Sequence, residues 1–157
     1  MDIKAIVLLT GAPAEESNGA TNFAAYPLSL LDVLGRPAIH HLVRHLKRQN
    51  AAEVAVISES PLPPLTSSAR AEQNTMNWTV ARGQQLWRAA ENAFIELAQS
   101  GAEEILVLRM GAYVEVDVDS LIQAHMDNRT HATQAFAHDG TPMDLFIVSA
   151  SHRNEAA

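Results

Sequence analysis

The chain contains no cysteine and carries few positive charges. Its 157 residues include 11 Lys and Arg against 18 Asp and Glu, which gives a formal net charge of −7. Without cysteine the protein has no disulfide, no thiolate metal site and no cysteine nucleophile, and this usage fits a cytoplasmic protein. The acidic balance argues against nucleic acid and anionic membranes as partners, because both attract clustered Lys and Arg.

Long apolar runs are also missing. The first run, residues 6–9, is far shorter than a membrane-spanning helix requires, and no signal-peptide pattern opens the chain. Hydrophobic residues make up 47% of the sequence and charged residues 18%, a balance typical of globular proteins. The length allows one sizeable core, so we expect residues 1–157 to form a single domain.

Three continuous apolar runs have the length of strands that are covered on both faces, as in a parallel sheet. They comprise residues 4–10, 53–58 and 104–108. Between them, Pro37 suits the first position of a helix, and apolar residues recur at helical spacing after it. A second helix is expected at residues 84–99, with Gly101 as its stop signal. Helices that alternate with strands predict an α/β fold, a Rossmann-like three-layer sandwich with a mainly parallel sheet.

Shorter elements complete this prediction. Residues 113–118 alternate apolar and acidic side chains, which is the pattern of a half-exposed strand. Asp119 or Ser120 can cap a short helix that turns His125 and Met126 toward the core. Further strands are expected at residues 78–81, 130–137 and 143–148.

Two stretches resemble motifs of a known enzyme family. Residues 27–42 read PLSLLDVLGRPAIHHL, and residues 106–125 read LVLRMGAYVEVDVDSLIQAH. They are similar to the KPLLPVxGKPLI and LVLNGDxY stretches of the nucleoside-diphosphate-sugar pyrophosphorylases, a family of nucleotidyltransferases. The resemblance implies the nucleotide-diphospho-sugar transferase fold. It also implies an activity that joins a sugar 1-phosphate to a nucleoside triphosphate, uses Mg²⁺ and releases pyrophosphate.

The residues that perform chemistry in this family are replaced. In the family an arginine of the glycine-rich loop and a later lysine meet the phosphates, but here no Lys or Arg occurs between Lys4 and Arg36. The aspartate that holds the family's metal falls on Gly111 or Ala112, depending on the alignment. Nucleotidyl transfer needs cations that neutralise developing charge, and Mg²⁺ needs one or two oxygen anchors. The sequence therefore predicts no catalytic residue and no metal ligand.

Four residues are candidates for nucleotide binding. Thr10 and Gly11 end the first strand and open the remnant of the glycine-rich loop, whose backbone N–H groups could hold a phosphate. Gly83 and Gln84 fall where the family has a glycine-rich turn that reads the base, and the glutamine could hydrogen-bond a base edge. The alternative is that Gln84 is a plain surface residue at the start of a helix.

Histidines and tryptophans receive structural interpretations. His41 and His45 stand one helical turn apart, a spacing that can bind Zn²⁺, but no third ligand is evident. We expect both, together with His40, on a solvated polar face. Trp78 and Trp87 are expected to pack against other residues rather than to form a stacking platform.

The preferred interpretation is a nucleotidyltransferase-like domain of sugar-nucleotide metabolism, a pseudoenzyme with a regulatory, scaffolding or subunit role. Its partners would be a nucleotide or nucleotide-sugar and another protein or a second copy of the chain, and no cofactor is expected. The alternative is an active sugar-phosphate nucleotidyltransferase that uses Mg²⁺. The family's sugar-binding region is missing, so either that region is deleted or the chain is the N-terminal part of a longer protein.

Overall fold

The computed structural model describes residues 1–10, 30, 32–33, 35–61, 76–110 and 117–150. Its elements, in chain order, are β1 (Ile3–Leu9), β2 (Asp32–Val33), β3 (Arg36–Pro37), α1 (Ala38–Arg48), β4 (Ala51–Ser58), β5 (Asn77–Val80), α3 (Gln84–Gln99), β6 (Glu104–Met110), α4 (Val118–Asn128), β7 (Ala132–Phe136) and β8 (Pro142–Ser149). No helix in these ranges is long and apolar enough to cross a membrane.

The larger sheet has six strands in the order β5-β4-β1-β6-β8-β7. β1 runs parallel to both of its neighbours, β4 and β6, and β5 extends the parallel set beyond β4. β8 is antiparallel to both β6 and β7, so within this sheet it runs against the other strands. The mainly parallel sheet that the sequence predicts is confirmed.

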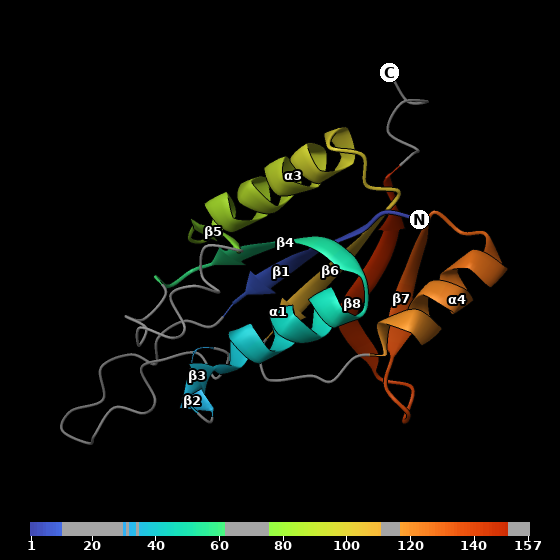
Figure 1. Ribbon diagram of the computed structural model, residues 1–157, viewed down its shortest axis with the longest axis horizontal. Coiled ribbons are helices and arrows are strands. Elements are labelled where there is room, and N and C mark those ends of the chain that lie inside the picture. The colour runs from blue at the N-terminus through green and yellow to red at the C-terminus, as the bar shows by residue number, and fades with distance from the viewer. Residues whose placement is uncertain (11–29, 31, 34, 62–75, 111–116, 151–157) are drawn as a thin grey trace.

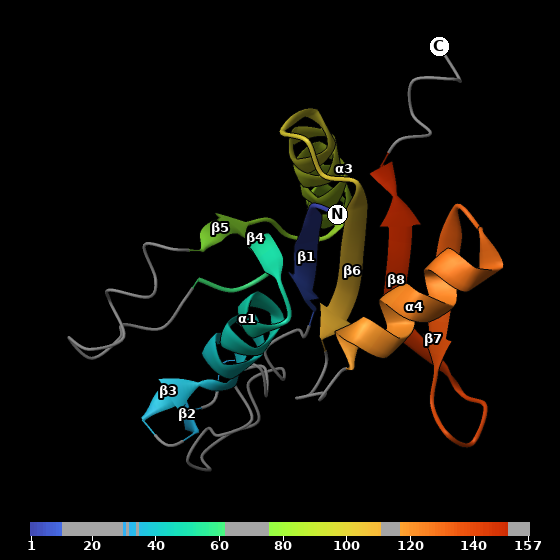
Figure 2. The same ribbon diagram turned by 45° about the vertical axis from the view of Figure 1, so that its right-hand side comes forward.

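Helices cover both faces of the sheet. α3 lies on one face, and α1 and α4 lie on the other (Figures 1 and 2). The face toward α1 and α4 buries a cluster that includes Val7, Leu9, Ile39, Leu42, Val56, Leu106 and Ile147. The face toward α3 buries a second cluster that includes Ile6, Leu8, Ile57, Leu86, Leu97 and Ile105. The predicted three-layer sandwich is thus confirmed.

β1 lies at the centre of both clusters, and all seven of its residues are buried. Each apolar side chain of this kind stabilises the fold by about 1.5–3 kcal/mol when fully buried. Lys4 is the polar exception in this strand. Its ammonium group donates hydrogen bonds to the carbonyl oxygen and Oγ of Ser100 at 3.1 and 2.6 Å and lies 3.5 Å from the carboxylate of Glu53. This buried lysine therefore ties β1 to the end of α3 and to β4.

α1 begins at Ala38, one residue later than predicted, because Pro37 is its N-cap and belongs to β3. The expectation of a solvated face for its histidines is wrong for His40, whose side chain is only 3% exposed. The reason is that the first turn is enclosed rather than lying on the surface, since residues 37–40 are all buried. His41 is half-buried, and its Nε2 lies 2.9 Å from the carbonyl oxygen of Val33.

α4 begins at Val118, which the sequence predicts as the last residue of a strand over residues 113–118. Residues 113–116 of that predicted strand lie outside the described residues. The N-cap is Asp117 rather than Asp119 or Ser120. Its Oδ1 accepts a hydrogen bond from the backbone N–H of Ser120 at 3.1 Å, and its Oδ2 accepts one from the Ser120 hydroxyl at 2.7 Å. These bonds from Ser120 hold the pKa of Asp117 below its ordinary value.

The inner face of α4 carries a buried polar network. His125 is 2% exposed, as predicted, whereas Met126 is 52% exposed, because the next residue along a helix is rotated by about 100°. Nδ1 of His125 lies 2.8 Å from Oγ1 of Thr133, and Nε2 lies 3.0 Å from Oγ of Ser149. The Ser149 hydroxyl donates in turn to the buried carboxylate of Glu104 at 3.1 Å. The network connects α4 to β6, β7 and β8.

Candidate functional site

The sheet reverses its strand order at β1. From β1 the chain moves to β4 and β5 on one side, and it then returns to β6 on the other side of β1. In open parallel sheets, ligands bind outside the carboxyl ends of the strands at such a reversal. The ends of β1 and β6, at Leu9 and Met110, therefore mark where a ligand site is expected.

A cavity of about 490 Å³ opens at this edge. It is lined by Thr10, Glu59, Gly83, Gln84, Leu86, Trp87 and Arg109. Three of the four residues predicted from the sequence, Thr10, Gly83 and Gln84, are brought together here. Gly11, the fourth, lies outside the described residues. Their role in nucleotide binding stays a prediction, but their common location is now established.

Strand ends and one helix start build the cavity. Thr10 follows β1, Glu59 follows β4, and Arg109 is the last residue but one of β6. α3 starts at the arrowhead end of β1 and β4, so its first turn closes the same side (Figure 1). Gly83 has φ 55° and ψ −128°, a backbone conformation that side chains strongly disfavour. Glycine is therefore required where the chain turns into α3.

Arg109 brings a positive charge to the cavity. Its Nε donates a hydrogen bond to Oγ1 of Thr10 at 2.9 Å, and its Nη1 lies 3.6 Å from Oδ2 of Asp144 on β8. The sequence does not predict Arg109 as a site residue, because it lies on the neighbouring strand β6 and not in the loop after β1. A charged residue within the otherwise apolar run LVLRM was the signal that could have revealed it.

Glu59 brings the opposite charge. Its Oε1 accepts a hydrogen bond from the backbone N–H of Gly83 at 3.4 Å, and its carbonyl oxygen accepts one from Nε of Arg82 at 3.1 Å. The helix dipole favours a carboxylate at this end of a helix. Glu59 therefore competes with any external anion for the start of α3, and it too was missed by sequence reasoning.

The two tryptophans differ in environment. Trp78 packs against the core cluster under α1, as predicted, while Trp87 is 58% exposed and lines the cavity, contrary to the prediction. The physical reason is helical rotation: Leu86 takes the inward position of α3, which turns the next residue outward. Trp87 and Gln84 together offer an aromatic surface and an amide, groups on which a nucleobase can stack and to which it can hydrogen-bond.

Within the described ranges, no group of three His, Asp or Glu side chains is placed to hold a metal ion. Gly111 and Ala112, where the family's metal aspartate would fall, lie outside those ranges and have no side-chain oxygen. The carboxylate that lines the cavity, that of Glu59, already accepts a hydrogen bond from Gly83. The described lining residues do not fit the oxygen-rich ligand set that Mg²⁺ prefers.

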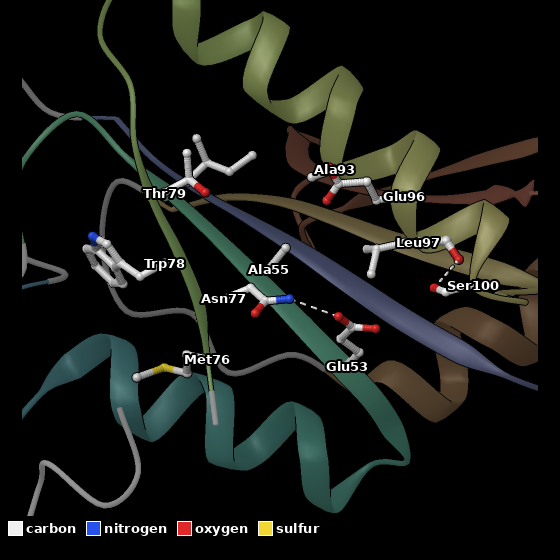
Figure 3. Close-up of a pocket in the computed structure, with 11 residues that line it drawn as sticks. Glu53, Ala55, Met76, Asn77, Trp78, Thr79, Ala93, Glu96, Leu97 and Ser100 are labelled. Carbon is white, nitrogen blue, oxygen red and sulfur yellow. Dashed lines mark hydrogen bonds between the residues drawn. The ribbon is translucent and has the colours of Figure 1, made fainter. Parts of the chain in front are cut away.

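A second cavity, also of about 490 Å³, lies beside the other half of α3 (Figure 3). Ala93, Glu96 and Leu97 of α3 face it from one side. On the other side, Nδ2 of Asn77 donates a hydrogen bond to Oε1 of Glu53 at 2.9 Å, drawn as a dashed line in Figure 3. This second cavity lies away from the carboxyl ends of β1 and β6, and none of the four residues predicted to bind a nucleotide is among its described lining residues. The cavity at the strand reversal is therefore the candidate site.

Solved structures resemble the chain in fold. A Bacillus anthracis protein assigned as a glucose-1-phosphate thymidylyltransferase, in complex with a sucrose, matches with a TM-score of 0.60 and 13% identity over 94% of this chain and 72% of that chain. A 4-diphosphocytidyl-2C-methyl-D-erythritol synthase matches with a TM-score of 0.58 and 13% identity over 99% and 80%. HddC from Yersinia pseudotuberculosis matches with a TM-score of 0.50 and 13% identity over 94% and 77%.

The chain has the nucleotide-diphospho-sugar transferase fold. At these low identities the likeness concerns the fold, and the chemistry has to be argued from the residues of the site. No protein-family model matches the sequence, and no curated protein matches it.

Proposed function

We propose that the chain is a nucleotidyltransferase-like domain of sugar-nucleotide metabolism that binds a nucleotide or nucleotide-sugar and has lost nucleotidyl transfer. Its role would be regulatory or scaffolding, exerted on a protein partner or on a second copy of the chain. The observation that carries the proposal is the cavity at the strand reversal, where Thr10, Gly83 and Gln84 lie beside Arg109 and Trp87.

Three of these residues have side chains that suit a part of a nucleotide. The guanidinium of Arg109 suits a phosphate, the amide of Gln84 suits a base edge, and the indole of Trp87 suits the face of a base. HddC, which shares the fold, has been solved in complex with GMP-PN. Binding by this chain is therefore compatible with both its fold and its own residues.

Loss of catalysis is supported by the groups that the sequence lacks. No cation occurs between Lys4 and Arg36, and neither Gly111 nor Ala112 can hold a metal through a carboxylate. Removal of one group that stabilises developing charge typically costs about 2–4 kcal/mol of transition-state stabilisation. Here the cations and the metal ligand are missing together, and Glu59 adds a negative charge beside the cavity.

A second candidate function is an active sugar-phosphate nucleotidyltransferase. Arg109 favours it, because this residue brings to the end of β1 a cation that the loop itself does not supply. An active site would then need its Mg²⁺ ligands from residues outside the described ranges. The two functions differ in turnover, which can be measured directly.

Calorimetric titration with ATP, CTP, GTP, UTP and dTTP, each with and without Mg²⁺, tests the proposal together with an assay for pyrophosphate release from sugar 1-phosphates. We expect at least one nucleotide to bind and no pyrophosphate to form. Pyrophosphate release that depends on Mg²⁺ would establish the active enzyme instead. If no nucleotide or nucleotide-sugar binds, the ligand-binding role is wrong.

The lining residue Gln84 provides the matched control for specific binding. Gln84→Ala should weaken the binding of the preferred nucleotide, because it removes the amide from the cavity. Gln85→Ala changes the neighbouring glutamine, which is exposed and is not among the lining residues, and should leave the affinity unchanged. Equal effects of the two substitutions would mean that the nucleotide binds elsewhere.

A further inference from the structure

We infer that Arg109 is the phosphate-binding residue of this chain, a cation that β6 supplies in place of those missing from the loop after β1. The inference rests on the proposed nucleotide-binding function and names the group that holds the phosphates. The ligand chemistry is the phosphate chain of a nucleoside diphosphate, a nucleoside triphosphate or a nucleotide-sugar. Thr10 is its positioning residue, and Asp144 is a carboxylate that competes with the phosphate for the guanidinium.

The strand determines where Arg109 points. Ile105 and Val107 of β6 pack on the side of the sheet that faces α3. Side chains alternate along a strand, so Arg109 projects to that same side, two residues further toward the carboxyl end. This is the side on which α3 begins and the cavity opens, so the guanidinium is a lining group of the cavity.

The contacts of Arg109 hold its guanidinium in place and leave it able to bind an anion. A guanidinium group has donors on three nitrogens, and the contacts with Thr10 and Asp144 engage Nε and Nη1. Arginine recognises phosphate through such a planar fork of donors. The bond to Thr10 fixes the plane of the fork at the end of β1, where the family's phosphate loop begins.

A purely structural role for Arg109 fits the geometry less well. The side chains of Arg109 and Asp144 are 48% and 58% exposed, and they meet at 3.6 Å. Exposed ion pairs of this kind contribute little to stability unless their geometry is bidentate. A phosphate, which carries more negative charge than one carboxylate, can displace Asp144 while the bond to Thr10 stays.

Calorimetric titration without Mg²⁺ tests the inference on wild-type protein, Arg109→Gln and Asp144→Asn. The probes are the nucleoside triphosphate bound most tightly by the wild type, the corresponding nucleoside, and inorganic pyrophosphate. Arg109→Gln should weaken triphosphate and pyrophosphate binding at least about tenfold, since a charge-assisted hydrogen bond is lost, and should leave nucleoside binding unchanged. Asp144→Asn should strengthen triphosphate binding, because it removes a competing carboxylate.

The control is Arg48→Gln, which removes the same charge from an exposed residue at the end of α1, just before the amino end of β4. Thermal unfolding verifies that each variant is folded. Triphosphate binding that Arg109→Gln leaves unchanged overturns the inference and leaves the proposed function standing. The same conclusion follows if Arg109→Gln and Arg48→Gln weaken triphosphate binding equally, or if Asp144→Asn weakens it. Failure of the wild type to bind any nucleotide or nucleotide-sugar overturns both.

Discussion

At the level of single residues, the candidate cavity is lined by one cation, Arg109, and one anion, Glu59. Arg109 is fixed by Thr10 at the end of β1, and Glu59 is fixed by Gly83 at the start of α3. A nucleotide that enters must gain the contact with the arginine and tolerate the glutamate. The balance between these two charges, rather than the volume of the cavity, is expected to set the affinity for phosphates.

Removal of the anion should therefore increase nucleotide affinity. Glu59→Gln keeps an oxygen that can accept from the N–H of Gly83 but removes the charge that repels phosphate, so we expect triphosphate binding to tighten by several-fold. Titration calorimetry at low ionic strength measures the effect. Glu103→Gln, at an exposed glutamate beside the start of β6, should change nothing. Weaker binding by Glu59→Gln would indicate that the carboxylate itself contacts the ligand.

The residues of this cavity differ in how far the sequence reveals them. Gly83 and Gln84 are predictable because they fall where the family that the sequence resembles has a glycine-rich turn that reads the base. Arg109 and Glu59 belong to strand ends that are distant in the sequence, so their meeting depends on the order of strands in the sheet. Trp87 was misjudged because hydrophobicity alone does not give the direction of a side chain on a helix.

At the level of elements, α4 is attached to the sheet by polar contacts as well as by apolar packing. If the proton of His125 resides on Nε2, the ring donates to Ser149, whose hydroxyl donates to Glu104, and its Nδ1 accepts from Thr133. This arrangement satisfies both ring nitrogens in a site where His125 is 2% exposed. Buried polar groups of this kind make a network whose members depend on one another.

Truncation of His125 should be costly. His125→Ala removes the ring that contacts the half-buried hydroxyl groups of Thr133 and Ser149 and lies 3.2 Å from the Glu104 carboxylate, and it creates a cavity. We therefore expect a loss of about 2–4 kcal/mol in the free energy of unfolding. Urea denaturation measures this loss. His138→Ala, in the exposed turn between β7 and β8, is the matched control and should cost little. A double-mutant cycle with Glu104→Gln should show coupling, and strict additivity would contradict the network.

The N-cap of α4 gives the stability of the protein a dependence on pH. The pKa of Asp117 is lowered in the folded state by its bonds to Ser120, so its contribution is fully present above the ordinary value of 3.8. It is lost as the pH falls through the lowered folded value. Asp117→Asn keeps a capping oxygen without the charge, so its Tm should lie a few degrees below that of the wild type at neutral pH.

Thermal unfolding across this pH range tests the cap. The difference in Tm between wild type and Asp117→Asn should shrink in acid, because the wild-type carboxyl group is then protonated as well. A difference that is the same at neutral pH and well below pH 3.8 would show that the charge of Asp117 does not stabilise α4.

Elements differ in how well local sequence defines them. α3 matches its predicted range of residues 84–99, because a glycine flanks it on each side and its apolar positions follow one period. α4 does not match its prediction, because the residues VDV alternate as they would in a strand. Its N-cap at Asp117 depends on a hydrogen bond from Ser120, three residues further along the chain. His40 shows the same limit, because the local pattern does not reveal that the first turn of α1 is buried.

At the level of the whole molecule, β1 organises both core clusters. It pairs with β4 and β6, its odd-numbered residues face α1, and its even-numbered apolar residues face α3. The strands at the two edges of the sheet, β5 and β7, are mostly exposed or half-buried. Stability should therefore decrease from the centre of the sheet to its edges.

Hydrogen exchange can map this gradient. We expect amides of β1 and β6 to exchange by global unfolding and those of β5 and β7 to exchange at least about tenfold faster, through local opening. Mass spectrometry of peptic fragments resolves the strands. Comparable protection of β5 and β1 would mean that something further covers the β5 edge in solution.

The placement of the two tryptophans provides the protein with two separate optical reporters. Trp87 lies exposed at the cavity, and Trp78 is packed against the core below α1. In Trp78→Phe the remaining indole emission should be quenched by acrylamide and by any base that stacks on it. In Trp87→Phe the emission of Trp78 should be unaffected by ligands and should shift only when the protein unfolds. Fluorescence alone can thus follow occupancy of the cavity in one variant and unfolding in the other.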